Sequence, residues 1–198
     1  MLNETDYLRV PSALEAIEAE TKAIGFGMGS ERTVGALLRM LAASKCSGKT
    51  SARFLELGTG TGISTAWLLD GMNADSRLTT VDNDATCVEI ARRHLGLDGR
   101  VEFHIADGSE FLAGLVVNRF DLIFADTWPG KFFDLDLALT LLKPGGFYVI
   151  DDLLPQSNWP EDHAPKVRQL IQSLYELNEL VICPMAWSSG ILVAVKKA

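Results

Sequence analysis

The chain has 198 residues, of which 47% are hydrophobic and 22% are charged. This length and composition suit one folded domain, and they argue against two full domains, a disordered segment or a fibrous repeat. Eighteen lysines and arginines stand against 26 aspartates and glutamates, so the net charge is −8. Such a charge repels phosphate groups, and no basic cluster offsets it, so nucleic-acid binding is not expected.

The sequence also bears on location. No stretch approaches the 18 or more consecutive apolar residues of a membrane span, and the acidic residues within Met1–Asp6 do not match a signal peptide. The three cysteines, Cys46, Cys87 and Cys183, form neither a C-x-x-C pair nor an even set. We therefore expect a reduced, cytoplasmic chain without a membrane partner.

Two helices are predicted before the first strand. Ser12 and Glu15 have the spacing of a capping box, which opens a helix that runs towards Ile24 and stops at Gly25. A glycine-rich turn over residues 25–30 leads into a second helix from Glu31 to about Ala43. These helices form an N-terminal cap over residues 1–50 of a single expected domain, 1–198, whose core spans 51–198.

From Arg53 onward, short β-rich runs alternate with helical runs, as in βαβ units. This alternation predicts an α/β fold with a doubly wound, mostly parallel sheet of seven strands. Leu180–Cys183 and Gly190–Lys196 follow a helix over Ala164–Leu177, and we expect them to pair antiparallel at the sheet edge, so that the last strand is antiparallel. The five strands before them are predicted at Arg53–Leu57, Arg77–Asp82, Arg100–Ala106, Phe120–Asp126 and Gly146–Asp151.

A glycine-rich turn follows the first predicted strand directly, with Gly58, Gly60 and Gly62 on alternate positions before a helix over Ile63–Leu69. In a parallel sheet, this first turn is where backbone amides and a helix N-terminus meet a ligand. Glycine permits close approach and positive φ there. The spacing departs from the dinucleotide fingerprint G-x-G-x-x-G, because Ile63 takes the place of the third glycine, and this argues against NAD.

Acidic residues follow the next two strands. Asp82 ends the second strand, where a carboxylate can accept hydrogen bonds from both hydroxyl groups of a ribose. Asn83 follows it, and Asp84 is better placed than Asp82 to cap the next helix. Asp107, with Gly108 after the third strand, can either meet an adenine edge or cap a helix.

The run Glu56-x-Gly58-x-Gly60-x-Gly62 together with Asp82 resembles the signature of class I S-adenosylmethionine-dependent methyltransferases, whose Rossmann-like fold has the same order of elements. The two leading helices, the Met28-Gly29-Ser30 turn and the later aspartates are similar to the small O-methyltransferases of the catechol and caffeoyl-CoA type. The resemblance implies S-adenosylmethionine as cofactor and methyl transfer to an oxygen of a small-molecule acceptor.

The resemblance also implies cofactor contacts. Glu56 would face the methionine moiety, Asp82 would hold the ribose, and Asn83 would lie beside it. The rest of the cofactor would meet Met28, Asp107, Gly108, Asp126 and Trp128.

Three aspartates end the fourth and fifth predicted strands: Asp126, Asp151 and Asp152. Oxygen ligands of this kind suit Mg²⁺. In the family resembled, the matching positions hold a metal that lowers the pKa of the acceptor hydroxyl, so all three are predicted metal ligands, and Asp126 and Asp151 are also predicted catalytic residues. The alternative is that Asp126 and Asp151 cap helices and position ligands without a metal, while Asp152 is solvated.

Two positions depart from that family. Asp152 stands where those enzymes have asparagine, which makes the cluster more anionic. Pro129 stands where they carry a lysine near the acceptor. Lys131, two residues further on, is the remaining candidate for a catalytic lysine, although its spacing differs.

The acceptor side is less defined by the sequence. Trp128 can either wall the acceptor pocket or pack in the core. The connection over residues 153–163 has the length of a binding loop, and His163 at its end is either a general base or a surface helix cap. A homodimer could form through the N-terminal helices or the edge hairpin.

Three other functions remain open: an aminopropyltransferase, an NAD-dependent oxidoreductase and a catalytically silent cofactor-binding protein. An aminopropyltransferase would need a fuller acidic polyamine site than the Asp126–Gly130 run provides. A silent binder would keep cofactor affinity without turnover, and fold likeness alone does not establish activity.

Overall fold

The computed structural model describes residues 7–48, 51–156, 159 and 162–198. These residues build a seven-stranded sheet in the order β3-β2-β1-β4-β5-β7-β6. Six strands run in one direction, and β7 alone runs in the other, between β5 and β6. The predicted fold class is confirmed. The strands are β1 (Arg53–Leu57), β2 (Arg77–Asp82), β3 (Val101–Ile105), β4 (Phe120–Ala125), β5 (Leu142–Ile150), β6 (Leu180–Met185) and β7 (Ile191–Lys196).

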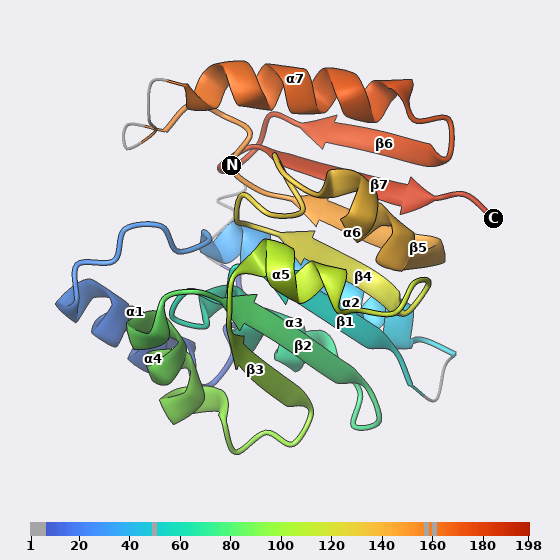
Figure 1. Ribbon diagram of the computed structural model, residues 1–198. Coiled ribbons are helices and arrows are strands. Elements are labelled where there is room, and N and C mark those ends of the chain that lie inside the picture. Colours follow the sequence, from blue (N-terminus) through green and yellow to red (C-terminus); the bar gives the residue numbers. More distant parts are fainter. Residues whose placement is uncertain (1–6, 49–50, 157–158, 160–161) are drawn as a thin grey trace.

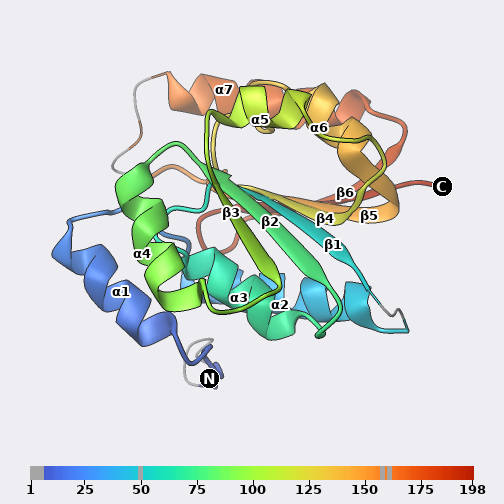
Figure 2. The ribbon, with the colours of Figure 1, turned by 60° about the horizontal axis from the view of Figure 1, so that its bottom comes forward.

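Helices cover both faces of the sheet, as the two views in Figures 1 and 2 show. The first four helices lie on one face and the last three on the other, and each layer has its own cluster of buried side chains against the strands. The alternating strand residues Phe54 and Leu55 point into opposite layers, as the period of two requires. The helices are α1 (Leu14–Ala23), α2 (Arg32–Cys46), α3 (Ile63–Gly71), α4 (Ala85–Leu95), α5 (Gly108–Ala113), α6 (Leu135–Leu141) and α7 (His163–Glu176).

The predicted start of α1 needs a correction. Its N-cap residue is Ala13, whose side chain makes no capping hydrogen bond, so Ser12 and Glu15 do not form the expected capping box. The helix depends instead on Leu14 and Ile17, which are fully buried in a hydrophobic cluster shared with α2 and α3. Its end is as predicted, since Gly25 follows with φ +70°.

The strand β5 begins earlier than predicted. Leu142 pairs with Phe120, but the register then shifts, and regular parallel pairing resumes between Leu122 and Phe147. The intervening residues 143–146 contain Gly145 at φ +74°, which lets the chain bulge within the strand. The sequence therefore located the regular part of this strand and missed its irregular start.

Along the described ranges, none of the helices has the length and apolar character needed to cross a membrane.

A buried carboxyl lies behind the glycine-rich turn. Glu56 on β1 has no exposed surface, and its Oε2 accepts hydrogen bonds from Thr65 (2.5 Å) and Thr80 (2.6 Å). Its Oε1 has no partner in the described structure. Burial raises the pKa of Glu56 from 4.5 to about 7, and the two threonine hydroxyls oppose this shift.

This shift predicts a pH-dependent stability. Because the folded-state pKa of Glu56 is above its unfolded value, the folded protein binds the extra proton between pH 4.5 and 7, and the free energy of unfolding falls as the pH rises through that window. We expect this group to contribute a fall of about 3 kcal/mol. Urea unfolding at several pH values should show a flatter profile for Glu56→Gln than for the wild type.

The exposed Glu179 provides the control, because Glu179→Gln removes a carboxyl that is not buried. Its pH profile should match that of the wild type. Equal slopes for the wild type and Glu56→Gln would contradict the prediction.

Candidate active site

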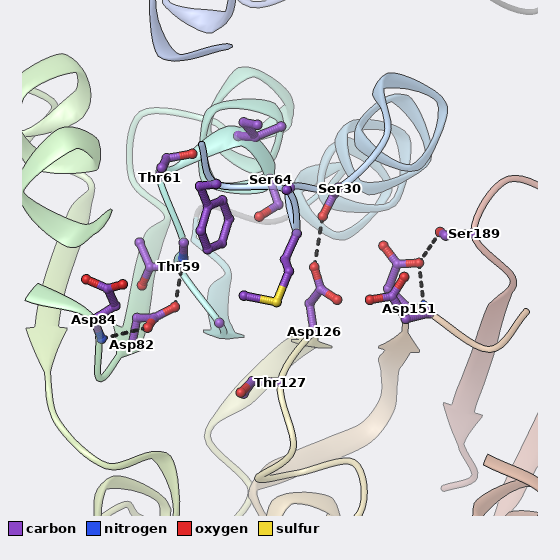
Figure 3. A pocket seen from close by; sticks show the side chains of 18 of the residues that line it. Ser30, Thr59, Thr61, Ser64, Asp82, Asp84, Asp126, Thr127, Asp151 and Ser189 are labelled. Atoms are coloured by element: carbon purple, nitrogen blue, oxygen red, sulfur yellow. Dashed lines mark hydrogen bonds between the residues drawn. The ribbon is translucent and has the colours of Figure 1, made fainter. Parts of the chain in front are cut away.

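A pocket of about 640 Å³ opens at the carboxyl ends of the parallel strands. Its lining comes from the turn before α2, the glycine-rich turn after β1, and the residues that follow β2, β4 and β5. This is the edge of an open α/β sheet where ligands bind. Figure 3 shows Asp82 and Asp84 on one side of the pocket and Asp126 and Asp151 on the other.

The three predicted glycines have different tasks. A Cβ on Gly58 would lie 2.8 Å from the backbone oxygen of Asp126, and one on Gly62 would lie 2.8 Å from the Cβ of Ala91 on α4. Gly60 lies against the ring of Phe26, and all three have positive φ. Gly58 and Gly60 line the pocket, whereas Gly62 lets α3 and α4 pack closely.

Asp82 supports the turn from the end of β2. Its Oδ2 accepts a hydrogen bond from the Gly60 amide at 2.8 Å, and its Oδ1 accepts one from the Asp84 amide at 2.9 Å. Asp84 caps α4 through the amides of Thr86 and Cys87, as predicted. Asp82 is thus free of the capping task and lines the pocket next to Asn83.

On the opposite side, two carboxylates are held by serines from distant segments. Asp126 accepts a hydrogen bond from Ser30 at 3.0 Å, and Asp151 accepts one from Ser189 and another from the Asp152 amide at 2.6 Å. Ser30 precedes α2 and Ser189 precedes β7, so segments far apart in the sequence both reach this rim of the pocket (Figure 3).

The local charges shift both carboxyl groups. Burial raises the pKa of Asp126 well above its usual value, and repulsion from Asp151 adds to this. Burial also raises the pKa of Asp151 to about 6, against the opposing hydrogen bond from Ser189. The positive charge of Lys131 favours ionisation of both groups and so opposes both shifts.

The structure does not show the predicted magnesium site. Within residues 7–48, 51–156, 159 and 162–198, no three or more histidine, cysteine, aspartate or glutamate side chains are grouped so as to hold a metal ion. Asp126, Asp151 and Asp152 line the same pocket, and the serines engage one oxygen each of Asp126 and Asp151.

The turn after β4 brings Lys131 to the pocket. The Trp128 carbonyl accepts hydrogen bonds from the amides of Lys131, Phe132 and Phe133, which coils the chain tightly there. Gly130 completes the turn at φ +79°, and its carbonyl accepts a hydrogen bond from Tyr148. Lys131 is only 3% exposed and lines the pocket. It therefore reaches the site although it lies two residues after Pro129, the position where the resembled family carries its lysine.

Aromatic side chains form the remaining wall. Trp128 is 36% exposed and lines the pocket with Trp159 and His163, so it is not a core residue. Contrary to the surface-cap alternative, His163 is 6% exposed, and the N-cap residue of α7 is Asp162.

Some predicted cofactor residues lie outside the pocket lining. Glu56 is buried behind the turn and Gly62 packs against α4. Asp107 caps α5 through the amides of Ser109 and Glu110, which supports the capping alternative. Gly108 makes room for Pro129, whose Cβ would lie 2.9 Å from an added Cβ.

Other lining residues had little or no signal in the sequence. Phe26 lies against Gly60, and Ser189 comes from the turn between β6 and β7. The antiparallel direction of β7 is the signal that could have identified Ser189, because it brings the start of that strand to the carboxyl end of β5. Nothing in the sequence pattern separates Phe26 from other turn residues.

Comparisons with known proteins agree with this geometry. Residues 55–153 match the methyltransferase domain family. A Mycobacterium ulcerans protein named "Putative O-methyltransferase" is 30% identical over 189 residues, which cover 90% of this chain and 83% of the relative. Several further mycobacterial relatives are matched over about 60% of their own length.

Solved structures show the same fold. A Klebsiella pneumoniae protein described as a "putative O-methyltransferase" is 25% identical to this chain. Its structure aligns with a TM-score of 0.83 over 97% of this chain and 93% of that one. An O-methyltransferase from Bacillus cereus, solved in complex with SAH, is 21% identical, with a TM-score of 0.82 over 97% and 94%. The resemblance inferred from the glycine-rich turn and Asp82 is therefore confirmed, and the chain belongs to the methyltransferase domain family.

Proposed function

We propose that the protein transfers the methyl group of S-adenosylmethionine to an oxygen atom of a small-molecule acceptor. The observation that carries this proposal is a single pocket with two distinct sides. The glycine-rich turn and Asp82 form one side, and Asp126, Asp151 and the aromatic wall form the other. Donor and acceptor could therefore be held together in one cleft.

The cofactor would lie across the glycine-rich turn. In this arrangement, the Asp82 carboxylate accepts hydrogen bonds from the ribose hydroxyl groups, since each of its oxygens keeps a free lone pair beside its backbone contact. Asn83 lies at the same edge, and Met28, which is 66% exposed, would cover the cofactor from the turn before α2.

The charge of the pocket suits this cofactor. Among the residues that the structure describes, six carboxyl groups line the pocket, and Lys131 is the one lysine or arginine there: Glu31, Asp82, Asp84, Asp126, Asp151 and Asp152. The sulfonium and ammonium groups of S-adenosylmethionine are cations, so the field attracts them. After transfer the sulfur is a neutral thioether, so this attraction weakens for the product.

The transfer itself would depend mainly on positioning. The acceptor oxygen must approach the methyl carbon in line with the breaking carbon–sulfur bond, and holding two reactants in this geometry supplies much of the rate. We assign Lys131 the task of keeping Asp126 and Asp151 ionised beside the reactants, because its charge favours their carboxylate forms. These three residues are the catalytic candidates.

Binding of the cofactor product provides the first test. Isothermal titration with S-adenosylhomocysteine should show binding to the wild type and a dissociation constant about 10- to 100-fold higher for Asp82→Asn, because hydrogen bonds to a charged acceptor are lost. Asp75→Asn changes an exposed aspartate in the turn before β2 and should bind like the wild type. Normal affinity in Asp82→Asn would contradict the ribose contact.

The same titration separates the alternatives. Binding of NAD without binding of S-adenosylhomocysteine would favour an oxidoreductase. Binding of S-adenosylhomocysteine without methyl transfer from labelled S-adenosylmethionine to phenols, alcohols or amines would favour a silent binder. Transfer of an aminopropyl group from the decarboxylated cofactor to a polyamine would favour an aminopropyltransferase.

Metal dependence is a separate prediction. Because the three aspartates do not group around one point, we expect dialysis against EDTA to leave methyl transfer within about two-fold of its initial rate, and added Mg²⁺ to have no larger effect. Loss of activity with EDTA and recovery with Mg²⁺, both absent in Asp151→Asn, would instead support the magnesium site predicted from the sequence.

A cytoplasmic location, a homodimer and a single domain over residues 1–198 stay predictions from the sequence. Sedimentation of the purified chain tests the dimer.

A further inference from the structure

The turn over residues 128–133 supplies two side chains to the pocket. Trp128 and Lys131 both line it, and Lys131 is only 3% exposed. Lys131 also lies two residues past Pro129, the position where the O-methyltransferases that the sequence resembles carry a lysine. The shape and place of the turn therefore decide whether these two side chains reach the acceptor side of the pocket.

Hydrogen bonds within the turn set its curvature. The Trp128 carbonyl accepts bonds from the amides of residues 131–133 at 2.8–3.1 Å, and the Gly130 amide donates to the Phe133 carbonyl at 2.7 Å. These bonds join the turn to itself, so they do not fix its place on the sheet. That place depends on contacts with other elements.

Tyr148 ties the turn to β5. Its side chain has no exposed surface and lies in the buried cluster that includes side chains of α6. Its hydroxyl donates a hydrogen bond to the Gly130 carbonyl. In the part of the chain that the structure describes, this is the hydrogen bond that joins residues 128–133 to another element. Burial raises the pKa of Tyr148, so the hydroxyl keeps its proton and remains a donor.

Gly130 allows the turn to lie directly on the sheet. It has φ +79°, and a Cβ there would overlap Cδ1 of Leu57 on β1 and lie 3.0 Å from the Tyr148 hydroxyl oxygen. Gly130 is buried as a result, and its carbonyl is enclosed together with the tyrosine hydroxyl. A side chain at this position would push the turn away from β1 and β5.

We propose that Tyr148 is a positioning residue for the acceptor: its hydroxyl holds the 128–133 turn where Trp128 and Lys131 face the acceptor side of the pocket. This inference rests on the proposed methyltransferase function and adds to it a residue from outside the pocket lining. Tyr148 acts through the Gly130 carbonyl. Without the hydroxyl, that carbonyl would be buried without a donor, and the turn would move so that the carbonyl meets water.

Tyr148→Phe tests the proposal, because it removes the hydroxyl and keeps the ring in the core. With catechol as the acceptor probe, we expect the KM of the acceptor to rise about ten-fold, the effect of losing one buried neutral hydrogen bond. We expect kcat to stay within about three-fold of the wild type. The dissociation constant of S-adenosylhomocysteine should not change, since the glycine-rich turn keeps its own bond to Asp82.

Phe120 provides a matched control for a general loss of stability. It is fully buried in the same cluster as Tyr148, but it begins β4, at the end opposite to the turn. Phe120→Leu removes buried volume and should lower the Tm, while the KM of catechol stays at the wild-type value. An equal rise of this KM in both variants would overturn the proposal, because the rise would then follow stability and not the turn.

A labelling measurement needs no acceptor. Because Lys131 is 3% exposed, an N-hydroxysuccinimide ester of acetic acid should acetylate it slowly in the wild type and in Phe120→Leu. In Tyr148→Phe, we expect this acetylation to be about five-fold faster, since the turn opens locally. Mass spectrometry of the digested protein gives the rate. Equal rates in the wild type and Tyr148→Phe would overturn the proposal.

Gly130→Ala provides a second variant that breaks the same contact from the side of the turn. It should also raise the KM of catechol and speed the acetylation of Lys131. Combined with Tyr148→Phe, it should add little, because both changes release one turn. Wild-type values of the KM and of the acetylation rate in Gly130→Ala would contradict the proposal.

The labelling result separates this proposal from the proposed function. If the wild type methylates another phenol, an alcohol or an amine and not catechol, that compound becomes the acceptor probe. If it methylates none of them, the proposed function fails, and the acetylation rates still decide whether Tyr148 holds the turn. Methylation by the wild type together with equal acetylation rates would overturn the role of Tyr148 alone.

Discussion

The close approach of Gly58 to the end of β4 is the constraint on which the site depends. The Gly58 amide bonds to the Val81 carbonyl of β2, and the Asp126 amide bonds to the Leu57 carbonyl of β1. A Cβ on Gly58 would lie 2.8 Å from the Asp126 carbonyl oxygen. Only with glycine there can the turn fold over the strand ends, so that Asp82 and Asp126 face one pocket.

The features that the sequence predicted well are those with a local cause. Alternating strands and helices follow from hydrophobic periodicity, and Asp84 caps α4 because it directly precedes that helix. The capping box at Ser12 was wrong because burial of Leu14 and Ile17, and not the local polar pair, holds α1 in place.

The candidate site was predicted only in part, because its second half depends on contacts between distant segments. Ser30 reaches Asp126 across 96 positions, and Ser189 reaches Asp151 across 38. Spacing along the chain could place the three aspartates at one edge of the sheet, but it could not show that serines occupy their oxygens. Nor could it show that the turn at Trp128 carries Lys131 into the pocket.

The turn between β6 and β7 also contacts the segment before α2 and the first turn of that helix. Ser188 bonds to Thr33 at 2.8 Å and to Glu31, 155 and 157 positions earlier. Because a ribosome makes the chain from its N-terminus, this part of the pocket cannot close until the turn between β6 and β7 has been synthesised, long after Glu31 and Thr33. The complete pocket would therefore form during synthesis only after β7 has entered the sheet between β5 and β6.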